Sequence, residues 1–210
     1  MIYLEVLCEG SSDVPVLREI LTRGLGLSED EHFRIHPHQG KGKLPENPLK
    51  LPKEWRNALL DQLPIKLRNY GRQAAGDYET AVLVVIDADD DDCKELKTSL
   101  LDMLAKLDSR PKRVLFRIAV EETESWFIAD PAAVKRAYGN CNTGNLNKIE
   151  PDSICGAWER LAEALGLDPR LDADKNEWAA QIAPHLDLAS PKSPSLHALL
   201  KGVPPLLAEA

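Results

Sequence analysis

Residues 80–89 read TAVLVVIDAD, an apolar run that ends in two aspartates. The continuous apolar stretch Ala81–Ile86 is typical of a strand buried on both faces of a parallel sheet. An earlier segment repeats the pattern, because the apolar stretch Ile2–Cys8 is followed by Glu9-Gly10-Ser11-Ser12-Asp13. In an open α/β sheet, the carboxyl ends of parallel strands are the usual place for ligands and catalysis. These two acidic strand ends therefore predict both a fold class and the position of a site.

Strands and helices alternate along the first two thirds of the chain. Apolar periodicity predicts strands at Ile2–Cys8, Phe33–His38, Thr80–Ile86 and Arg113–Val120. The helices expected between and after them are Asp13–Leu25, Lys53–Gln73 with a kink at Pro64, Cys93–Leu107, Ser125–Phe127 and Pro131–Tyr138. This order predicts an α/β fold, Rossmann-like, with a mostly parallel sheet and helices on both faces.

The composition changes after Gly139. Residues Asn140–Ser153 are polar and predict a loop, after which helices are expected at Cys155–Leu165, Lys175–His185 and Ser195–Leu200. We therefore expect an α/β domain at residues 1–139 with a basic helical insertion at about 41–76. Residues 140–210 should form a helical C-terminal extension packed on that domain.

The overall composition is that of a soluble globular protein, with 43% hydrophobic and 29% charged residues among 210. The longest apolar run is too short to span a bilayer, and the N-terminus lacks the basic region of a signal peptide. The four cysteines are scattered, without a C-x-x-C pair. This argues against a zinc site or a disulfide framework and predicts a cytoplasmic location.

The charge distribution is uneven. The formal net charge is −8, yet the segment Lys41–Arg72 carries eight basic and three acidic residues, a local excess of +5. A basic segment beside an acidic site suits a phosphodiester substrate, whereas its ordinary alternative is a solvated helix face and loop.

The acids at the strand ends are candidate metal ligands, because so many carboxylates in one place repel one another unless a cation gathers them. Hard oxygen ligands suit Mg²⁺ or Mn²⁺. We expect Glu9, Asp87 and Asp89 to be catalytic. The full candidate ligand set is Glu9, Asp13, Asp87, Asp89, Asp91, Glu121 and Glu124.

Each of these acids also has an ordinary explanation. Asp13 could cap the following helix, and Asp90–Asp92 could be favoured by the dipole of the next one. Asp87 and Asp89 alternate, so on an extended backbone they would point to one side and could share an ion. Which of Glu121, Glu122 and Glu124 after the fourth strand enters the site stays open here, with Glu124 favoured over Glu121 as the inward ligand.

Four basic residues are candidate contacts for nucleic-acid phosphates. They are His38, Lys41 and Lys43, which follow the second strand, and Lys192, which precedes the last predicted helix.

The motifs Glu9-Gly10-x-x-Asp13-x-x-x-Leu17 and Asp87-x-Asp89 resemble the two signature motifs of the TOPRIM superfamily. Within it, the chain is most similar to the bacterial family called domain of unknown function 4276. That similarity extends to the motif at residues 38–44, H-x-G-K-G-K-L, and to the motif at 121–127, E-x-x-E-S-W-F. The sequence departs from many TOPRIM domains at Asp92 and Cys93, where D-x-D-x-x-G would place a glycine.

The resemblance implies Mg²⁺- or Mn²⁺-dependent phosphoryl chemistry, with Glu9 as general acid/base or ligand and with Asp87 and Asp89 binding metal. It leads us to expect a nuclease acting on DNA or RNA. It also implies a possible ATPase partner protein in a bacterial defence module.

Three alternatives remain open at this point. A nucleotidyltransferase or primase-like enzyme would use the same site. A glycosyltransferase also places D-x-D after an apolar strand, but it does not require Glu9. A non-catalytic interaction or regulatory module would keep the fold without using the site.

Overall fold

A four-stranded parallel sheet forms the centre of the computed structural model, which describes residues 2–50, 56–73, 79–171 and 173–208. Its strands are β1 (Ile2–Cys8), β2 (Phe33–Pro37), β3 (Glu79–Asp87) and β4 (Arg113–Ala119). They lie in the order β2-β1-β3-β4, and every neighbouring pair is parallel. All four carboxyl ends therefore meet at one edge of the sheet.

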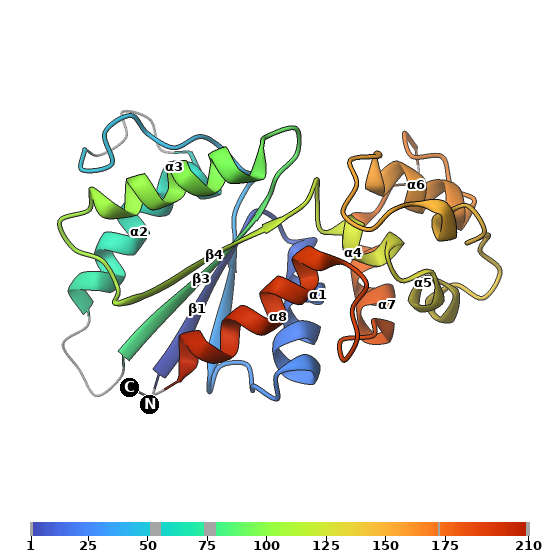
Figure 1. The fold of residues 1–210 in the computed structure, drawn as a ribbon, viewed down its shortest axis with the longest axis horizontal. Helices are drawn as coiled ribbons and strands as arrows, with labels where there is room; N and C mark the ends of the chain where they lie inside the picture. Colours follow the sequence, from blue (N-terminus) through green and yellow to red (C-terminus); the bar gives the residue numbers. More distant parts are fainter. Residues whose placement is uncertain (1, 51–55, 74–78, 172, 209–210) are drawn as a thin grey trace.

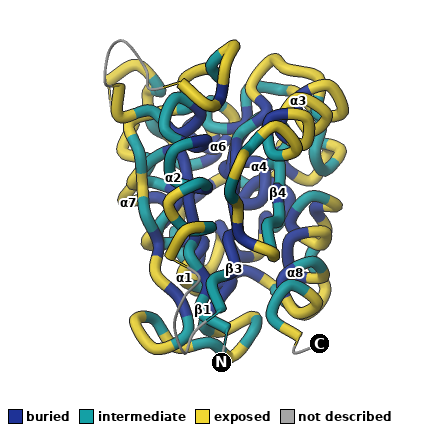
Figure 2. The backbone as a smooth tube through the Cα atoms, turned by 90° about the vertical axis from the view of Figure 1, so that its left-hand side faces the viewer, coloured by how far each residue is buried: buried dark blue, intermediate teal, exposed yellow. Residues whose placement is uncertain are grey.

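Alternation along the strands divides the interior into two cores. On β3, Val82, Val84 and Ile86 face helices α2 (Leu59–Gln73) and α3 (Cys93–Ala105), whereas Leu83 and Val85 belong to the opposite core. That opposite core contains α1 (Asp13–Glu19), which continues as the π-helical turn η1 (Ile20–Gly24), and α8 (Pro194–Leu207). Figure 1 shows these two helical layers on either side of the sheet, and Figure 2 shows the strands as the buried centre. This confirms the predicted α/β architecture.

The remaining helices gather beyond the carboxyl edge of the sheet (Figure 1). They are α4 (Glu124–Ile128), α5 (Pro131–Ala137), η2 (Leu146–Lys148), α6 (Ala157–Leu165), α7 (Lys175–Ile182) and η3 (Ala183–His185). The chain then returns to the sheet, where α8 packs mainly on β4. Leu196, Leu199 and Val203 of α8 are buried in the same core as α1.

Two helices differ from their predicted bounds by more than two residues, and the others differ by at most two, with η1 counted as part of α1 and η3 as part of α7. The helix predicted from Lys53 begins at Leu59 in the structure, and residues 51–55 lie outside the described part of the chain. The last helix was expected at Ser195–Leu200 but extends to Leu207, with Pro204 and Pro205 inside it. Within the described residues, every helix is too short or too polar to cross a bilayer.

Candidate acidic site at the carboxyl edge of the sheet

Two carboxylates of the first predicted motif contact neighbouring strand ends. Glu9 follows β1, and its Oε1 accepts the backbone N–H of Asp87, the last residue of β3, at 2.9 Å. Asp13 is buried at the start of α1, where Oδ2 accepts the N–H of Gly10 at 2.9 Å and Oδ1 accepts the hydroxyl of Thr123 at 3.0 Å. Asp13 thus holds the loop after β1 to the loop after β4, in addition to beginning a helix.

The loop after β4 brings further carboxylates to this edge of the sheet. Glu124 is 2% exposed at the start of α4, and its Oε2 lies 3.5 Å from the ammonium of Lys175. The same ammonium lies 2.5 Å from Oε2 of Glu122 and 5.5 Å from the centre of the Trp158 ring. The other oxygen of Glu122 accepts the backbone N–H of Trp158 at 2.8 Å. A lysine from α7 therefore lies against the acids that follow β4.

The electrostatics define an acidic cluster of Glu9, Asp13, Asp87 and Glu124. Burial raises the pKa of Glu9 to about 7, and it raises the pKa of Glu124 to about 7 despite the opposing charge of Lys175. The pKa of Asp87 is raised well above its usual range, first by burial and then by the charges of Asp13, Glu9 and Glu124. Burial also raises the pKa of Asp13. Shared desolvation and mutual repulsion of this kind are typical of functional sites.

The second predicted aspartate, Asp89, lies differently from Asp87. The strand ends at Asp87, and Asp89 has a left-handed backbone with φ of 49°, so the extended geometry that would point both side chains to one side is not found. Lys41 binds this loop: its ammonium donates to the carbonyl of Ala88 at 2.8 Å and lies 3.2 Å from Asp89 and 2.7 Å from Asp91. Asp89 still acts on the cluster, because its charge raises the pKa of Glu9.

The neighbouring acid Asp92 has a structural role. Its Oδ1 accepts the backbone N–H groups of Lys94 and Glu95 at 2.8 and 3.0 Å. Asp92 therefore caps α3, as the helix-dipole explanation anticipated for the acids of this loop.

Glu121 is also engaged away from the cluster. Its carboxylate accepts three backbone N–H groups at the start of α6, those of Cys155, Gly156 and Ala157, at 3.2, 2.6 and 3.2 Å. This arrangement satisfies amides that a helix leaves unpaired at its N-terminus. Of the acids weighed for this position, the structure brings Glu124 to the cluster and turns Glu121 to the start of α6.

The predicted phosphate contacts fall in separate places. Lys41 and Lys43 line a hollow of about 510 Å³ between their own loop, the aspartate loop 89–91 and the start of α3. His38 donates Nδ1–H to the carbonyl of Cys8 at 2.8 Å, and burial lowers its pKa. A neutral ring held this way presents a lone pair at Nε2 rather than a proton, so His38 as placed does not suit phosphate binding.

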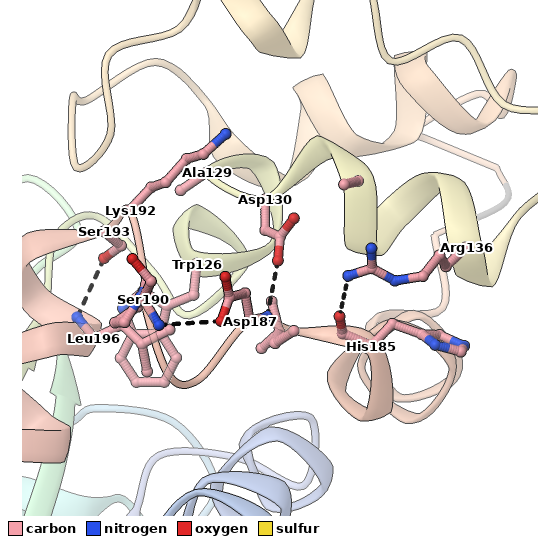
Figure 3. A pocket seen from close by; sticks show the side chains of 13 residues that line it. Trp126, Ala129, Asp130, Arg136, His185, Asp187, Ser190, Lys192, Ser193 and Leu196 are labelled. Carbon is pink, nitrogen blue, oxygen red and sulfur yellow. Dashed lines mark hydrogen bonds between the residues drawn. The ribbon is translucent and has the colours of Figure 1, made fainter.

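Lys192 lines a different hollow. This second hollow, of about 420 Å³, lies among α4, α5 and the start of α8, where Figure 3 shows Lys192 and Arg136 on opposite sides. Its floor includes Trp126, which is buried and donates Nε1–H to the hydroxyl of Ser195 at 2.8 Å. The structure thus separates Lys192 from Lys41 and Lys43.

The acidic cluster fits a hard divalent cation in its chemistry, although its side chains would have to reorient around the ion. Among the residues that the structure describes, no three His, Cys, Asp or Glu side chains stand ready to hold a metal ion together. Both oxygens of Asp13 and one of Glu9 already accept hydrogen bonds. Carboxylate oxygens are nevertheless the preferred donors for Mg²⁺ and Mn²⁺, and a cation would relieve the repulsion that raises the pKa of Asp87.

Sequence reasoning left open which of Glu121, Glu122 and Glu124 enters the site, and it missed Lys175. Three glutamates within four positions, Glu121, Glu122 and Glu124, signal that a positive partner is needed, but nothing in the sequence identifies it. Lys175 is 53 positions away from Glu122.

Comparison with known proteins places the chain in one family. No curated protein and no solved structure matches the chain. A family model described as "Domain of unknown function (DUF4276)" matches residues 8–203, which include both acidic motifs and most of the returning helix α8. This match confirms the family resemblance predicted from the motifs: the chain belongs to the DUF4276 family.

Proposed function

We propose that the chain is a divalent-cation-dependent nuclease that cleaves phosphodiester bonds of DNA or RNA at the acidic cluster. The observation that carries this proposal is the crowding of four carboxylates at the carboxyl edge of a parallel sheet, where burial raises the pKa of each one. A structural role alone would favour paired carboxylates with lowered pKa values. The resemblance of the two motifs to TOPRIM domains supports the same reading.

We assign three roles to these residues: cation binding, positioning of a loop and phosphate binding. Glu9, Asp87 and Glu124 would hold Mg²⁺ or Mn²⁺, which when bound activates water and neutralises charge on the phosphate. Asp13, fixed by Gly10 and Thr123, positions the loop that carries Glu9. Lys41 and Lys43 border the adjacent hollow, where their ammonium groups would bind the phosphates of the substrate strand.

Two wider expectations belong to the same proposal. An ATPase partner would fit a small nuclease of a bacterial defence module, and a cytoplasmic location would fit the four free cysteines. A primase-like nucleotidyltransferase is the second candidate for the same site, and a non-catalytic module is the third.

The test is a cleavage assay with Mg²⁺ and with Mn²⁺ on supercoiled plasmid, single-stranded DNA and tRNA. Asp87→Asn should lower cleavage by at least about 100-fold, because loss of a ligand should cost no less than the loss of its supporting groups. The matched control is Asp102→Asn, which changes an exposed aspartate on α3 and should leave cleavage unchanged. Full cation-dependent cleavage by Asp87→Asn would contradict the proposal.

The same proteins also distinguish the alternatives. Incorporation of labelled nucleotides onto a primer, without cleavage, would support the nucleotidyltransferase. A chain that gains no thermal stability from Mn²⁺ or Mg²⁺ would support the non-catalytic module, because a ligand that binds the folded state must stabilise it.

A further inference from the structure

Lys175 is a cation in a place where a helix by itself disfavours one. It is the first residue of α7, and Asp174 caps this helix by accepting the N–H of Glu177 at 2.9 Å. The N-terminus of a helix carries partial positive charge, so a lysine there is unfavourable unless nearby acids compensate. The compensating acids are Glu122 and Glu124, at 2.5 and 3.5 Å.

The position of Lys175 is fixed from two sides. Its side chain is only 35% exposed, and its ammonium lies 5.5 Å from the centre of the Trp158 ring, in the range of a cation–π contact. Farther along α7, Trp178 is buried and anchors the helix in the core that contains α1. Lys175 is therefore held against the acids.

The lysine divides its charge between an acid inside the cluster and an acid beside it. Glu124 belongs to the acidic cluster, whereas Glu122 also accepts the N–H of Trp158 at 2.8 Å. Burial raises the pKa of Asp13, and the charge of Lys175 opposes that rise. Lys41, by comparison, pairs with Asp89 and Asp91, both of which are exposed.

We propose that Lys175 is the built-in counter-ion of the acidic cluster and that an incoming divalent cation must displace it from Glu124. This inference rests on the proposed function only in assuming that the cluster takes such a cation. The ammonium and a divalent ion repel each other strongly at the few ångströms that separate groups on one carboxylate. Lys175 can move away from Glu124 and keep Glu122 as its partner, because the Glu122 carboxylate is itself held in place by the N–H of Trp158. Lys175 thereby raises the concentration of divalent cation that is needed to occupy the site.

The experiment is a Mn²⁺ titration followed by thermal unfolding of the full chain at pH 8, where protons compete little for the carboxylates. Lys175→Met should lower the melting temperature without metal, because it leaves Glu124 without its counter-ion. It should also lower the Mn²⁺ concentration for half-maximal stabilisation by about tenfold or more, since a like charge next to the ion is removed. Lys175→Arg keeps the charge and should need as much Mn²⁺ as the wild type.

A matched control is Lys135→Met, which removes a lysine of α5 whose ammonium donates to the carbonyl of Cys141. It should leave the Mn²⁺ requirement unchanged. If Lys175→Met does not fold, Lys175→Gln keeps a hydrogen-bond donor for Glu122. It should lower the Mn²⁺ concentration for half-maximal stabilisation in the same way.

The outcomes separate the two proposals. A wild-type chain that Mn²⁺ does not stabilise would overturn the cation site itself. Suppose instead that Mn²⁺ stabilises the wild-type chain, and that Lys175→Met and Lys175→Gln need an equal or higher Mn²⁺ concentration for half-maximal stabilisation. This result would overturn the role of Lys175 alone. Such a result would leave Lys175 as a structural ion-pair partner of Glu122 and Glu124.

Discussion

Glu9 is buried at the end of a central strand, where an ionised carboxylate is costly. The amide of Asp87 and the ammonium of Lys41 favour its charged form, but burial outweighs both and raises its pKa from 4.5 to about 7. The folded chain therefore retains a proton that the unfolded chain releases at a lower pH. Between these two values, protonation of Glu9 stabilises the fold.

The stability of the metal-free chain should consequently fall as pH rises from about 4.5 to about 7. Glu9 should account for at most about 3 kcal/mol of this loss, because its pKa rises from 4.5 to about 7 and each pH unit between these values corresponds to about 1.4 kcal/mol. Urea unfolding in EDTA at pH 5, 6, 7 and 8 measures the slope, which Glu9→Gln should reduce. The exposed Glu95→Gln on α3 should keep the wild-type slope, and an unchanged slope in Glu9→Gln would contradict the assignment.

Single residues were predictable where a strand determines their position. Glu9 and Asp87 follow apolar runs, so the sequence alone places both at the carboxyl edge of the sheet. Asp89 was less predictable, because its left-handed backbone depends on a hydrogen bond from its own N–H to the carbonyl of Glu121. Lys175 was not predictable at all, because its contacts depend on how the distant helix α7 packs.

At the scale of elements, the loop after β4 attaches the C-terminal helices to the sheet. Glu121 accepts three amides of α6, and Glu122 accepts a fourth. A carboxylate at a helix N-terminus is favoured both by these hydrogen bonds and by the helix dipole. This role is structural and does not require a metal.

Glu121→Ala should therefore destabilise the chain by about 1–3 kcal/mol, since it leaves partly buried amides without an acceptor. Its Mn²⁺-linked stabilisation should stay at the wild-type value, unlike that of Asp87→Asn. Chemical unfolding with and without Mn²⁺ measures both effects, and Glu150→Ala at an exposed position is the control. Loss of the Mn²⁺ response in Glu121→Ala, with stability unchanged, would return Glu121 to the metal ligands.

The basic segment Lys41–Arg72 is less uniform in the structure than in the sequence. Arg68 and Arg72 lie 2.6 and 3.3 Å from Asp108, which neutralises part of the local excess. Lys41 is also paired, with Asp89 and Asp91, but it and Lys43 line the hollow at the aspartate loop and the two arginines do not. Nucleic-acid binding should therefore depend on the two lysines more than on the two arginines.

Changing Lys41 and Lys43 together to Gln should weaken duplex binding for all sequences. The slope of log K against log salt should fall by about 1.8, because each phosphate contact contributes about 0.9. Binding is measured on the Asp87→Asn background so that cleavage does not interfere. Changing Arg68 and Arg72 together to Gln removes the same charge and should leave the slope of log K against log salt unchanged. If only the arginine pair changed this slope, the phosphate contacts would lie at the arginines and not at the lysines.

Strand bounds were predicted to within one residue at every end, and three of the four strands are apolar runs closed by acids, which leaves little choice. The length of α8 was not predicted, since Pro204 and Pro205 each remove a backbone donor and normally end a helix. Burial of Leu196, Leu199 and Val203 against the sheet offsets that local cost. Most helix stability in proteins comes from such packing rather than from propensity.

At the scale of the whole molecule, the C-terminal extension completes the core of the α/β domain. Residues 140–210 were expected to pack on the domain at residues 1–139, and α8 from this extension covers one face of the sheet. The buried core on that face is continuous from β1 through α4, α6 and α7 to α8. Glu121 and Glu122 add polar contacts between the same two parts of the chain.

A fragment of residues 1–139 should therefore fail to fold cooperatively. Without α8 the sheet would expose the apolar side chains of β1 and β3 that now face it, and a sheet face of that size is not stable in water. In the full chain, Leu199→Ala should cost about 2–5 kcal/mol, as expected for a buried leucine. Lys201→Ala, on the exposed side of the same helix, should cost little. Near-ultraviolet circular dichroism and thermal unfolding measure the fragment and both variants. A fragment that unfolds cooperatively near the wild-type melting temperature would show that the sheet does not need α8. Because that fragment also lacks Lys175, its acidic cluster would then be stable without this lysine.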